Sequence, residues 1–403
     1  MNRLKIVIDA RRLRDFGIGT YIRSLVHALG ALDSVNQYVL VTLAEESRTI
    51  SGLPENFETA VYSRTSTSYH NHISFPFFLR TLSPDLFHIP LNRVPLLMPK
   101  PYVVTIHDMA SLLFEERSGL RMDWRRFLFR SGLERAERII AVSASTRRDV
   151  QNILGIPAER VRVVYNAPAP EFFTHQRTAD ARAAGPESHT LERKRILERY
   201  QINYPFVLYA GNIRPQKNIP RLVEAFAVAR EQLTDHPEYK DLHLIIIGDE
   251  ISEHPSVRRA VIQSRVEQAV RFLGFVPFDT LRNFYEAAAA FVFPSLYEGF
   301  GLPPLEAMAT GTPVVSSAVS SLPEVVGDAA MIVNPENVFD IARGIHEALT
   351  DISLRQDLIR RGKEHAARFS WERTAKEVLS IYQEVADERQ RQKAKGKRQK
   401  AGE

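Results

Sequence analysis

Short runs of hydrophobic residues alternate along this chain with longer segments in which hydrophobic residues recur at helical spacing. Several of the short runs are hydrophobic without interruption, which is typical of strands covered by helices on both faces. This alternation predicts an α/β fold with a parallel, doubly wound sheet. In the first half of the chain the expected strands are 5–9, 38–43, 86–89, 102–107, 138–143 and 161–165.

The alternation stops between residues 171 and 203, where a Gly-Pro pair and a charged stretch predict a linker with a helical second half. It then resumes, and the pattern predicts two Rossmann-like domains. The second set of expected strands is 205–210, 243–247, 270–273, 290–294, 313–316 and 330–333. The expected organisation is an N-terminal domain (1–175), a linker (176–203), a C-terminal domain (204–370), a helix packing back toward the N-terminal domain (371–388) and a basic, disordered tail (389–403). Ligands of doubly wound sheets bind beyond the carboxyl ends of the strands, so we expect the site in the cleft between the two domains.

The composition supports an ordinary globular protein of two or three domains, with 403 residues, 44% of them hydrophobic and 25% charged. The absence of cysteine excludes disulfides, thiol nucleophiles and thiolate metal sites, and it fits a reducing, cytoplasmic compartment. No signal peptide and no membrane-spanning run is expected from the hydrophobic pattern.

The charge pattern leaves two interpretations open. The net charge is +5, and seven Lys or Arg residues lie between 389 and 400 without any acid. This end is either a solvated tail or a patch attracted to the inner face of an anionic membrane. Residues 122–140 combine aromatic residues with arginines, as in a domain helix with a basic outer face or in a membrane-surface helix suited to a lipid-linked acceptor. No aromatic or glycine pattern accompanies the basic residues, so we expect no nucleic-acid partner.

The segment 291–308 carries the strongest functional signal. A buried strand ends near Pro294, a loop with Glu298 and two glycines follows, and a helix begins near Leu302 with prolines in its first turn. The glycines allow close approach of the backbone to a ligand, and a helix start attracts anions. Glu306 lies about one turn into the helix. Taken alone, the two glutamates could also be favourable charges near a helix N-terminus.

With its glycines and prolines, this segment resembles the E-x7-E signature of glycosyltransferase family 4, whose members are retaining enzymes of the GT-B fold. The resemblance covers nearly the whole chain, through residues 17–21, 105–108, 141–143, 164–166, 211–218 and 272–277. It implies a nucleotide-sugar donor bound mainly by the C-terminal domain and an acceptor bound mainly by the N-terminal domain. It also implies that Glu298 contacts the donor sugar and Glu306 the ribose. The backbone of Gly299, Phe300, Gly301 and Leu302 would bind the diphosphate.

Arg214 and Lys217 follow the first strand of the second domain, where two cations suit a diphosphate leaving group. An ordinary solvated turn is the alternative. Many family members place the arginine five residues before the lysine, and that position here is Asn212, which we include in the donor site. Lys217 is therefore the firmer of the two cationic assignments.

Three further positions match the family. Gly17 and Gly19 open a helix after the first strand, although two glycines also suit an ordinary tight turn, and Ile22 replaces the third glycine of a dinucleotide-binding fingerprint. His107 ends a buried strand facing the predicted cleft, where a lone histidine could also be structural; similar family histidines contact the donor sugar or support the reacting centre. Val276 matches the position whose backbone contacts the nucleotide base.

We predict a retaining hexosyltransferase that needs neither a metal nor another cofactor, since the chain lacks the D-x-D sequence of metal–diphosphate clamps. The motifs resemble those of mannosyl and rhamnosyl transferases of surface polysaccharides. GDP-mannose is therefore the favoured donor, and a glycan or glycolipid is the expected acceptor. A nucleotide-sugar epimerase or phosphorylase of the same fold, or a non-catalytic sugar-nucleotide-binding protein, remain alternatives.

Overall fold

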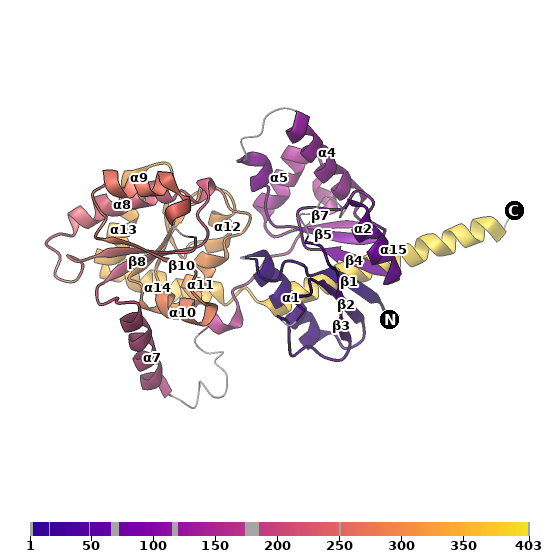
Figure 1. The fold of residues 1–403 in the computed structure, drawn as a ribbon, viewed down its shortest axis with the longest axis horizontal. Coiled ribbons are helices and arrows are strands. Elements are labelled where there is room, and N and C mark those ends of the chain that lie inside the picture. The colour runs from indigo at the N-terminus through magenta and orange to yellow at the C-terminus, as the bar shows by residue number, and fades with distance from the viewer. Residues whose placement is uncertain are drawn as a thin grey trace. The chain divides into compact units, whose positions relative to one another are not determined.

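The chain forms two compact units (Figure 1), and the computed structural model describes residues 3–15, 17–47, 49–65, 72–114, 120–173, 185–249 and 251–401. One unit comprises Met1–Asn166 together with Ser370–Glu403, and the other comprises Ala167–Phe369. The chain thus passes from the first unit to the second before residue 175, where we expected the boundary. The reason is that the 3-10 helix η3 (Pro170–Phe172) packs in the second unit, where Phe172 contacts Phe278 and Tyr285.

The first unit is built on a seven-stranded sheet of order β3-β2-β1-β4-β5-β6-β7 with parallel pairing throughout. Its strands are β1 (Lys5–Asp9), β2 (Gln37–Thr42), β3 (Phe57–Val61), β4 (Leu86–Ile89), β5 (Tyr102–Ile106), β6 (Arg138–Ala141) and β7 (Val161–Val163). The pattern predicted all of these except β3. That strand lies at the sheet edge and none of its residues is fully buried, so its sequence lacks a continuous hydrophobic run.

Helices flank this sheet: α1 (Ile18–Leu32), α2 (Ser74–Thr81), α3 (Ala110–Leu113), α4 (Leu120–Arg135), α5 (Ala144–Leu154), the 3-10 helix η2 (Ala158–Arg160) and the C-terminal helix α15 (Trp371–Ala401). Helix α1 buries Tyr21, Leu25 and Leu29, whose spacing of four residues explains why this segment is helical. Helix α5 begins at the Ser143 side chain, which accepts the Thr146 amide.

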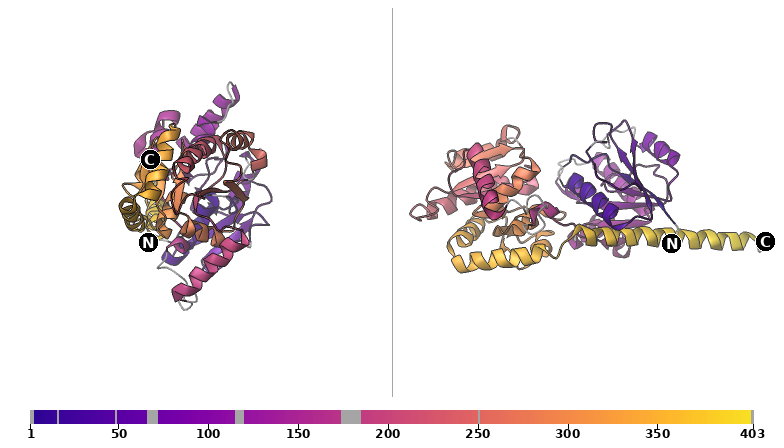
Figure 2. Two further views of the ribbon diagram at one scale, coloured as in Figure 1. Left: turned by 90° about the vertical axis from the view of Figure 1, so that its left-hand side faces the viewer. Right: turned by 90° about the horizontal axis from the view of Figure 1, so that it is seen from below.

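Helix α15 belongs to the first unit, along which it runs before continuing past it (Figure 2). Its buried residues are Trp371, Thr374, Ala375, Val378, Ile381, Tyr382 and Val385. The sequence predicted disorder from residue 389, but the helix continues to Ala401. Arg, Gln, Lys and Ala are strong helix formers and no proline interrupts them, so the segment extends the helix without needing to be packed.

The second unit holds a six-stranded parallel sheet of order β10-β9-β8-β11-β12-β13, which confirms the second doubly wound domain. Its strands are β8 (Phe206–Ala210), β9 (His243–Ile247), β10 (Val270–Gly274), β11 (Ala290–Phe293), β12 (Val314–Ser317) and β13 (Met331–Val333). Its helices are α7 (Gly185–Arg199), η4 (Pro215–Lys217), α8 (Ile219–Gln232), η5 (Ile251–Glu253), α9 (Pro255–Gln263), α10 (Phe278–Ala287), α11 (Leu302–Thr310), α12 (Leu322–Val326), α13 (Val338–Thr350) and α14 (Ile352–Ala366).

In this unit α8, α9 and α13 lie on one face of the sheet, and α10, α11 and α14 lie on the other (Figure 1). Part of the expected linker falls outside the described residues. The remainder forms α7, which packs on α10 and is therefore part of the second unit. No helix within the described ranges is both long and apolar enough to cross a membrane.

The strand order determines which loops of the second unit are neighbours. Strands β8 and β11 pair at the centre of the sheet, although eighty residues separate them in sequence. Their helices, α8 and α11, leave toward opposite faces, so the loops after the two strands meet at the point where the strand order reverses. These two loops carry Lys217 and Glu298.

Candidate active site

An ion pair joins the two loops at the centre of the second sheet. The Lys217 Nζ donates to both carboxylate oxygens of Glu298, at 2.6 Å to Oε1 and 2.7 Å to Oε2. The side chains are 16% and 11% exposed, so most of the pair is shielded from water. Lys217 also lies 5.5 Å from the ring centre of Phe293, at the end of β11. The sequence predicted both residues for the site, but gave no sign that they would bind each other.

Backbone-directed hydrogen bonds hold the Glu298 loop in place. Ser320 Oγ donates to the Glu298 carbonyl at 2.6 Å, and Ser321 Oγ lies 2.9 Å from the same oxygen and 2.7 Å from the Phe300 carbonyl. The Leu296 amide donates to the Gln216 carbonyl at 2.7 Å, which ties this loop directly to η4. The loops after the two central strands are therefore joined by a direct backbone hydrogen bond.

Asn218 reinforces this connection from the buried side of η4. Its Nδ2 group donates to the carbonyls of Pro294 and Pro335 at 3.0 and 2.7 Å. The residue has a φ of 63°, a left-handed conformation that asparagine tolerates better than most residues. Asn218 thus lets the chain turn into α8 and also fixes the end of β11.

The turn into α11 requires glycine at position 301. Gly301 has a φ of 110°, and a Cβ atom there would lie 2.7 Å from Leu322 Cδ2. The next helical residues include Pro303 and Pro304, which have no N–H group. The predicted phosphate-binding segment from Gly299 to Leu302 directly precedes these prolines, and Gly299 and Phe300 are buried within it.

Glu306 has a different environment from Glu298. It lies inside α11, is 8% exposed, and its Oε2 accepts a hydrogen bond from the Tyr285 hydroxyl at 3.0 Å. Burial raises the pKa of Glu306 to about 7, against a smaller lowering by the Tyr285 hydrogen bond. Near neutral pH this carboxyl therefore exchanges between its protonated and ionised forms.

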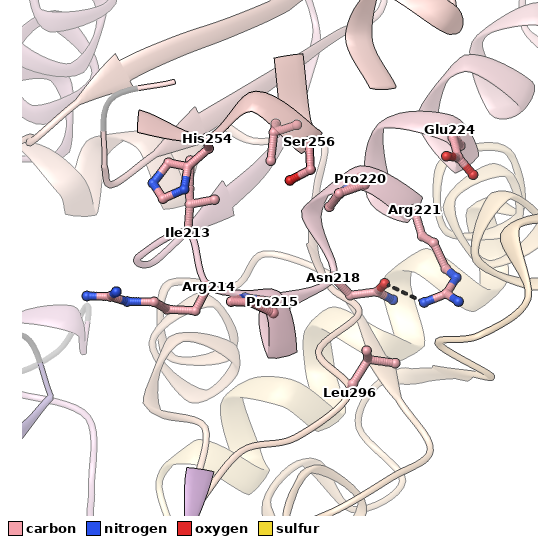
Figure 3. A pocket seen from close by; sticks show the side chains of 11 residues that line it. Ile213, Arg214, Pro215, Asn218, Pro220, Arg221, Glu224, His254, Ser256 and Leu296 are labelled. Carbon is pink, nitrogen blue, oxygen red and sulfur yellow. Dashed lines mark hydrogen bonds between the residues drawn. The ribbon is translucent and has the colours of Figure 1, made fainter. Parts of the chain in front are cut away.

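Arg214 is exposed just before η4 and lines a cavity of about 500 Å³ together with Leu296, His254 and Arg221. In Figure 3, Arg221 turns toward Asn218, to which it donates at 3.1 Å, while Arg214 lies on the other side of Pro215. Arg214 is thus close in sequence to the ion pair but has a separate, open position.

Asn212 and Val276 are the other two residues of this unit that we predicted to bind the nucleotide-sugar donor. The Asn212 carbonyl accepts the Tyr209 hydroxyl at 3.0 Å. The side chain of Val276 is buried, whereas the neighbouring Phe275 is 70% exposed. A backbone contact of Val276 with a nucleotide base stays a prediction.

The remaining predicted residues, Gly17, Gly19 and His107, belong to the first unit. Gly17 precedes α1 with a φ of 66°. A Cβ atom on Gly19 would lie 2.4 Å from the Leu13 carbonyl oxygen, so glycine is needed there for close backbone packing. These two positions therefore have a structural reason to be glycine in addition to any role in binding.

His107 follows β5 in a well-defined setting. Its amide donates to Asn92 Oδ1 at 3.0 Å, and its Nε2 donates to the Pro90 carbonyl at 3.1 Å. Burial lowers the pKa of His107 to about 4; the Pro90 contact opposes this shift and the charge of Arg12 adds to it. The imidazole is therefore neutral at neutral pH, so a role as a cationic acid is not favoured.

Sequence reasoning missed several residues that hold the site together. They are Asn218, Tyr285, Ser320 and Ser321, and, in the first unit, the buried ion pair of Asp9 and Arg11, whose shortest N–O distance is 2.7 Å. Ser320 and Ser321 follow β12, so the rule that functional residues lie at the carboxyl ends of strands could have found them. The partner of Glu306 could not have been found in this way, because Tyr285 lies within a helix.

Among the residues that the structure describes, no three His, Cys, Asp or Glu side chains form a group that could hold a metal ion. The absence of a metal requirement stays a prediction.

Two doubly wound parallel sheets in one chain are the architecture of GT-B proteins. The family model for glycosyl transferases group 1 matches residues 192–365, and the model for Glycosyltransferase Family 4 matches residues 17–171. The O-antigen chain mannosyltransferase B of Escherichia coli is 32% identical over 306 residues, which cover 75% of each protein. The chain therefore belongs to glycosyltransferase family 4, as its motifs predicted.

Two other similarities extend this result. The serotype-specific mannosyltransferase WbdA of Escherichia coli is 32% identical over 289 residues, or 71% of this chain, which spans about a third of WbdA (33%). The solved structure of Anabaena HepE in complex with UDP-glucose matches with a TM-score of 0.74 at 16% identity, covering 95% of this chain and 100% of that one. At this level of identity the likeness confirms the GT-B fold.

The raised pKa of Glu306 predicts a specific dependence of stability on pH. The unfolded carboxyl has a pKa near 4.5, so the folded state holds its proton more tightly. The associated stability is present below about pH 4.5 and is lost as pH rises through 7, by at most roughly 3 kcal/mol. We expect the melting temperature of the wild type, relative to Glu306→Gln, to fall between pH 5 and pH 8. The exposed Glu336→Gln is the control, and parallel pH curves for wild type and Glu306→Gln would contradict the expectation.

Proposed function

We propose that this protein transfers a hexose, with retention, from a nucleotide diphosphate to a hydroxyl of a glycan or lipid-linked glycan during surface polysaccharide synthesis on the cytoplasmic side of the membrane. The observation that carries the proposal is the bidentate Lys217–Glu298 pair beside the glycine turn into α11. A cation, a carboxylate and backbone donors are the groups needed to bind a phosphate and a sugar hydroxyl side by side.

The ion pair gives these two residues a common role. Without a donor, Lys217 and Glu298 neutralise each other in a position that is largely shielded from water. An incoming diphosphate offers Lys217 a stronger anionic partner, and this exchange releases the Glu298 carboxylate to accept hydrogen bonds from the donor sugar. Donor binding and the readiness of Glu298 are therefore coupled.

In the reaction, the bond between the anomeric carbon and the diphosphate oxygen breaks, and the nucleotide diphosphate leaves with the electron pair. Lys217, Arg214 and the backbone amides of Gly299 to Leu302 stabilise the growing negative charge, so no metal ion is needed for this step. The acceptor oxygen bonds to the anomeric carbon on the same face, and its proton passes to the leaving phosphate. Glu298 and the neutral His107 orient the reacting sugar.

The ribose is assigned to Glu306. Its carboxylate would accept hydrogen bonds from the ribose hydroxyls, while Tyr285 keeps it oriented through the 3.0 Å hydrogen bond. Because only the ionised form accepts at both oxygens, donor binding would favour loss of the Glu306 proton.

The nucleotide donor can be tested directly. Both curated relatives described above are named mannosyltransferases, which supports GDP-mannose. At a donor concentration a hundred times its dissociation constant, mass action stabilises the folded state by about 2.7 kcal/mol. We expect GDP-mannose to raise the melting temperature by roughly 5 °C and UDP-glucose, ADP-glucose and dTDP-rhamnose to raise it less. A larger shift with one of these three would assign a different donor.

The exchange of partners by Lys217 makes a distinctive prediction for nucleotide binding. In Lys217→Met the Glu298 charge remains, unpaired, next to the diphosphate, so this variant should bind GDP more weakly than the double variant Lys217→Met/Glu298→Gln. We expect a difference of about tenfold in Kd by calorimetry, since like charges a few ångströms apart repel by more than 1 kcal/mol near a protein surface. Both variants should lose at least about a hundredfold in kcat. The exposed Lys240→Met is the control. Equal GDP affinities for the single and double variants would exclude the exchange.

We also propose that helix α4 contacts the membrane that carries a lipid-linked acceptor. Trp124 and Phe127 are 57% and 54% exposed and stack with ring centres 5.5 Å apart. Arg126 and Arg130 are exposed on the same helix. Exposed aromatic rings among arginines suit the interface of an anionic bilayer.

This surface can be tested with vesicles that contain phosphatidylglycerol. The double variant Trp124→Ser/Phe127→Ser should bind them at least about tenfold more weakly, because the hydrophobic transfer of two aromatic side chains is lost. Phe339→Ser, which alters an aromatic ring that is 73% exposed in the second unit, should bind like the wild type. Unchanged binding by the double variant would assign the contact to another surface, with the basic end of α15 as the next candidate.

A further inference from the structure

A chain of hydrogen bonds crosses the core of the first unit from its C-terminal helix. The Tyr382 hydroxyl of α15 lies 2.6 Å from His88 Nδ1 in β4. His88 Nε2 lies 2.8 Å from Thr105 Oγ1 in β5, which in turn lies 3.0 Å from the Tyr21 hydroxyl in α1. All four side chains are fully buried. Burying a polar group costs free energy unless the group is hydrogen-bonded. Every donor and acceptor in this series of hydrogen bonds therefore needs a partner.

The position of each proton along this series of hydrogen bonds follows from the groups at its two ends. Burial, with a smaller effect of His107, lowers the pKa of His88 to about 3, so its imidazole is neutral and carries one N–H. The Tyr382 hydroxyl lies at the end of the series with His88 Nδ1 as its neighbour, so we assign its proton to that bond. The proton of His88 is then on Nε2 and is donated to Thr105. Thr105 and Tyr21 share the last hydrogen bond. Tyr382 of helix α15 thereby sets the tautomer of a histidine in strand β4.

The chain ends against His107. The ring of Tyr21 meets the His107 ring edge-on, with centres 4.8 Å apart and an interplanar angle of 82°. Trp371 of α15 also meets the Tyr21 ring, at 5.8 Å and 69°. Thr105 and His107 are two residues apart along β5 and its continuation, so they lie on the same face of the sheet. Tyr21 is therefore held by its hydroxyl at Thr105 and by its ring at Trp371 and His107.

Helix α15 supplies both of these supports. Trp371 and Tyr382 are three helical turns apart, which places them on the same face of the helix. One contacts Tyr21 directly and the other reaches it through His88 and Thr105. Helix α15 thus supports Tyr21, and Tyr21 contacts His107, the residue that follows β5.

We propose that Tyr382, His88, Thr105 and Tyr21 are positioning residues that hold the His107 ring in one orientation, while the Pro90 carbonyl fixes its tautomer. This inference rests on the proposed function only in assigning His107 to the reaction. The positioning itself is a property of the first unit without a ligand. It also means that His107 is fully supported only after α15, which follows the whole second unit in the chain, has packed.

The direct test is NMR of the protein with 15N-labelled histidine rings. Long-range spectra distinguish the two neutral tautomers, and His107→Gln and His88→Gln assign the signals. We expect the wild type to show a single Nε2–H form for both rings. In Tyr382→Phe, which keeps the aromatic ring but removes the donor, His88 should lose its single tautomer, and the His107 signals should shift or broaden. Thr105→Val should have the same effect on His107, and Thr105→Ser should restore the wild-type signals.

A matched control separates this effect from a general loss of stability. Tyr102 lies at the opposite end of β5, is fully buried, and donates to the Gly132 carbonyl at 2.6 Å. Tyr102→Phe removes a comparable hydrogen bond and should leave the His107 signals unchanged. If Tyr102→Phe shifts them as much as Tyr382→Phe does, or if Tyr382→Phe leaves them unchanged, the positioning role is excluded.

Kinetics then test the connection with catalysis. We expect Tyr382→Phe to lower kcat about tenfold, because misplacing a reacting group is costly, with KM for the donor changed less than about twofold. Altered His107 signals together with normal kcat would support the positioning but exclude His107 from the reaction. A lower kcat with unchanged His107 signals would overturn the proposal, because the loss would then arise elsewhere.

Discussion

The pairing of β8 with β11 is the constraint on which the candidate site depends. These strands are distant in sequence, and their parallel register at the centre of the sheet brings the loops after them together. Lys217 and Glu298 meet there as a shielded ion pair. A buried or half-buried ion pair contributes little net stability, because desolvation offsets the attraction. Its value here lies in placing a cation and a carboxylate next to the turn into α11, where each can find a partner on a donor molecule.

The residues around this pair serve mainly to make it rigid. Asn218, Ser320 and Ser321 donate to backbone carbonyls, and Gly301 provides a turn that a side chain would obstruct. Hydrogen bonds to the backbone fix loop positions without adding charge to the site. The electrostatic balance therefore depends on a few residues: Lys217 and Glu298 neutralise each other, Arg214 is exposed nearby, and burial raises the pKa of Glu306 to about 7.

In the first unit, the buried polar residues are the ones that we propose to position His107. Burial keeps both His88 and His107 neutral, and hydrogen bonds to uncharged groups satisfy them. Helix α15 completes this support from the far end of the sequence. The return of the chain to the first unit is therefore a requirement of its core. Beyond Val385, none of residues 386–395 is fully buried, and Glu388 and Arg389 still contact Arg138 and Asp85.

The sequence by itself determined the fold class and nearly every strand, because strands covered on both faces must be hydrophobic throughout. It missed β3, whose edge position removes that requirement, and it predicted disorder where helix-forming residues continue α15. It also predicted Glu298, Lys217 and the glycine turn as site residues, because close backbone approach and anion binding would restrict which residues can occupy a loop. Only the tertiary structure decided their partners. The pairing of Lys217 with Glu298, of Glu306 with Tyr285 and of His88 with Tyr382 joins residues that are 81, 21 and 294 positions apart. Such contacts follow from strand order and helix packing, which no local pattern of side chains records.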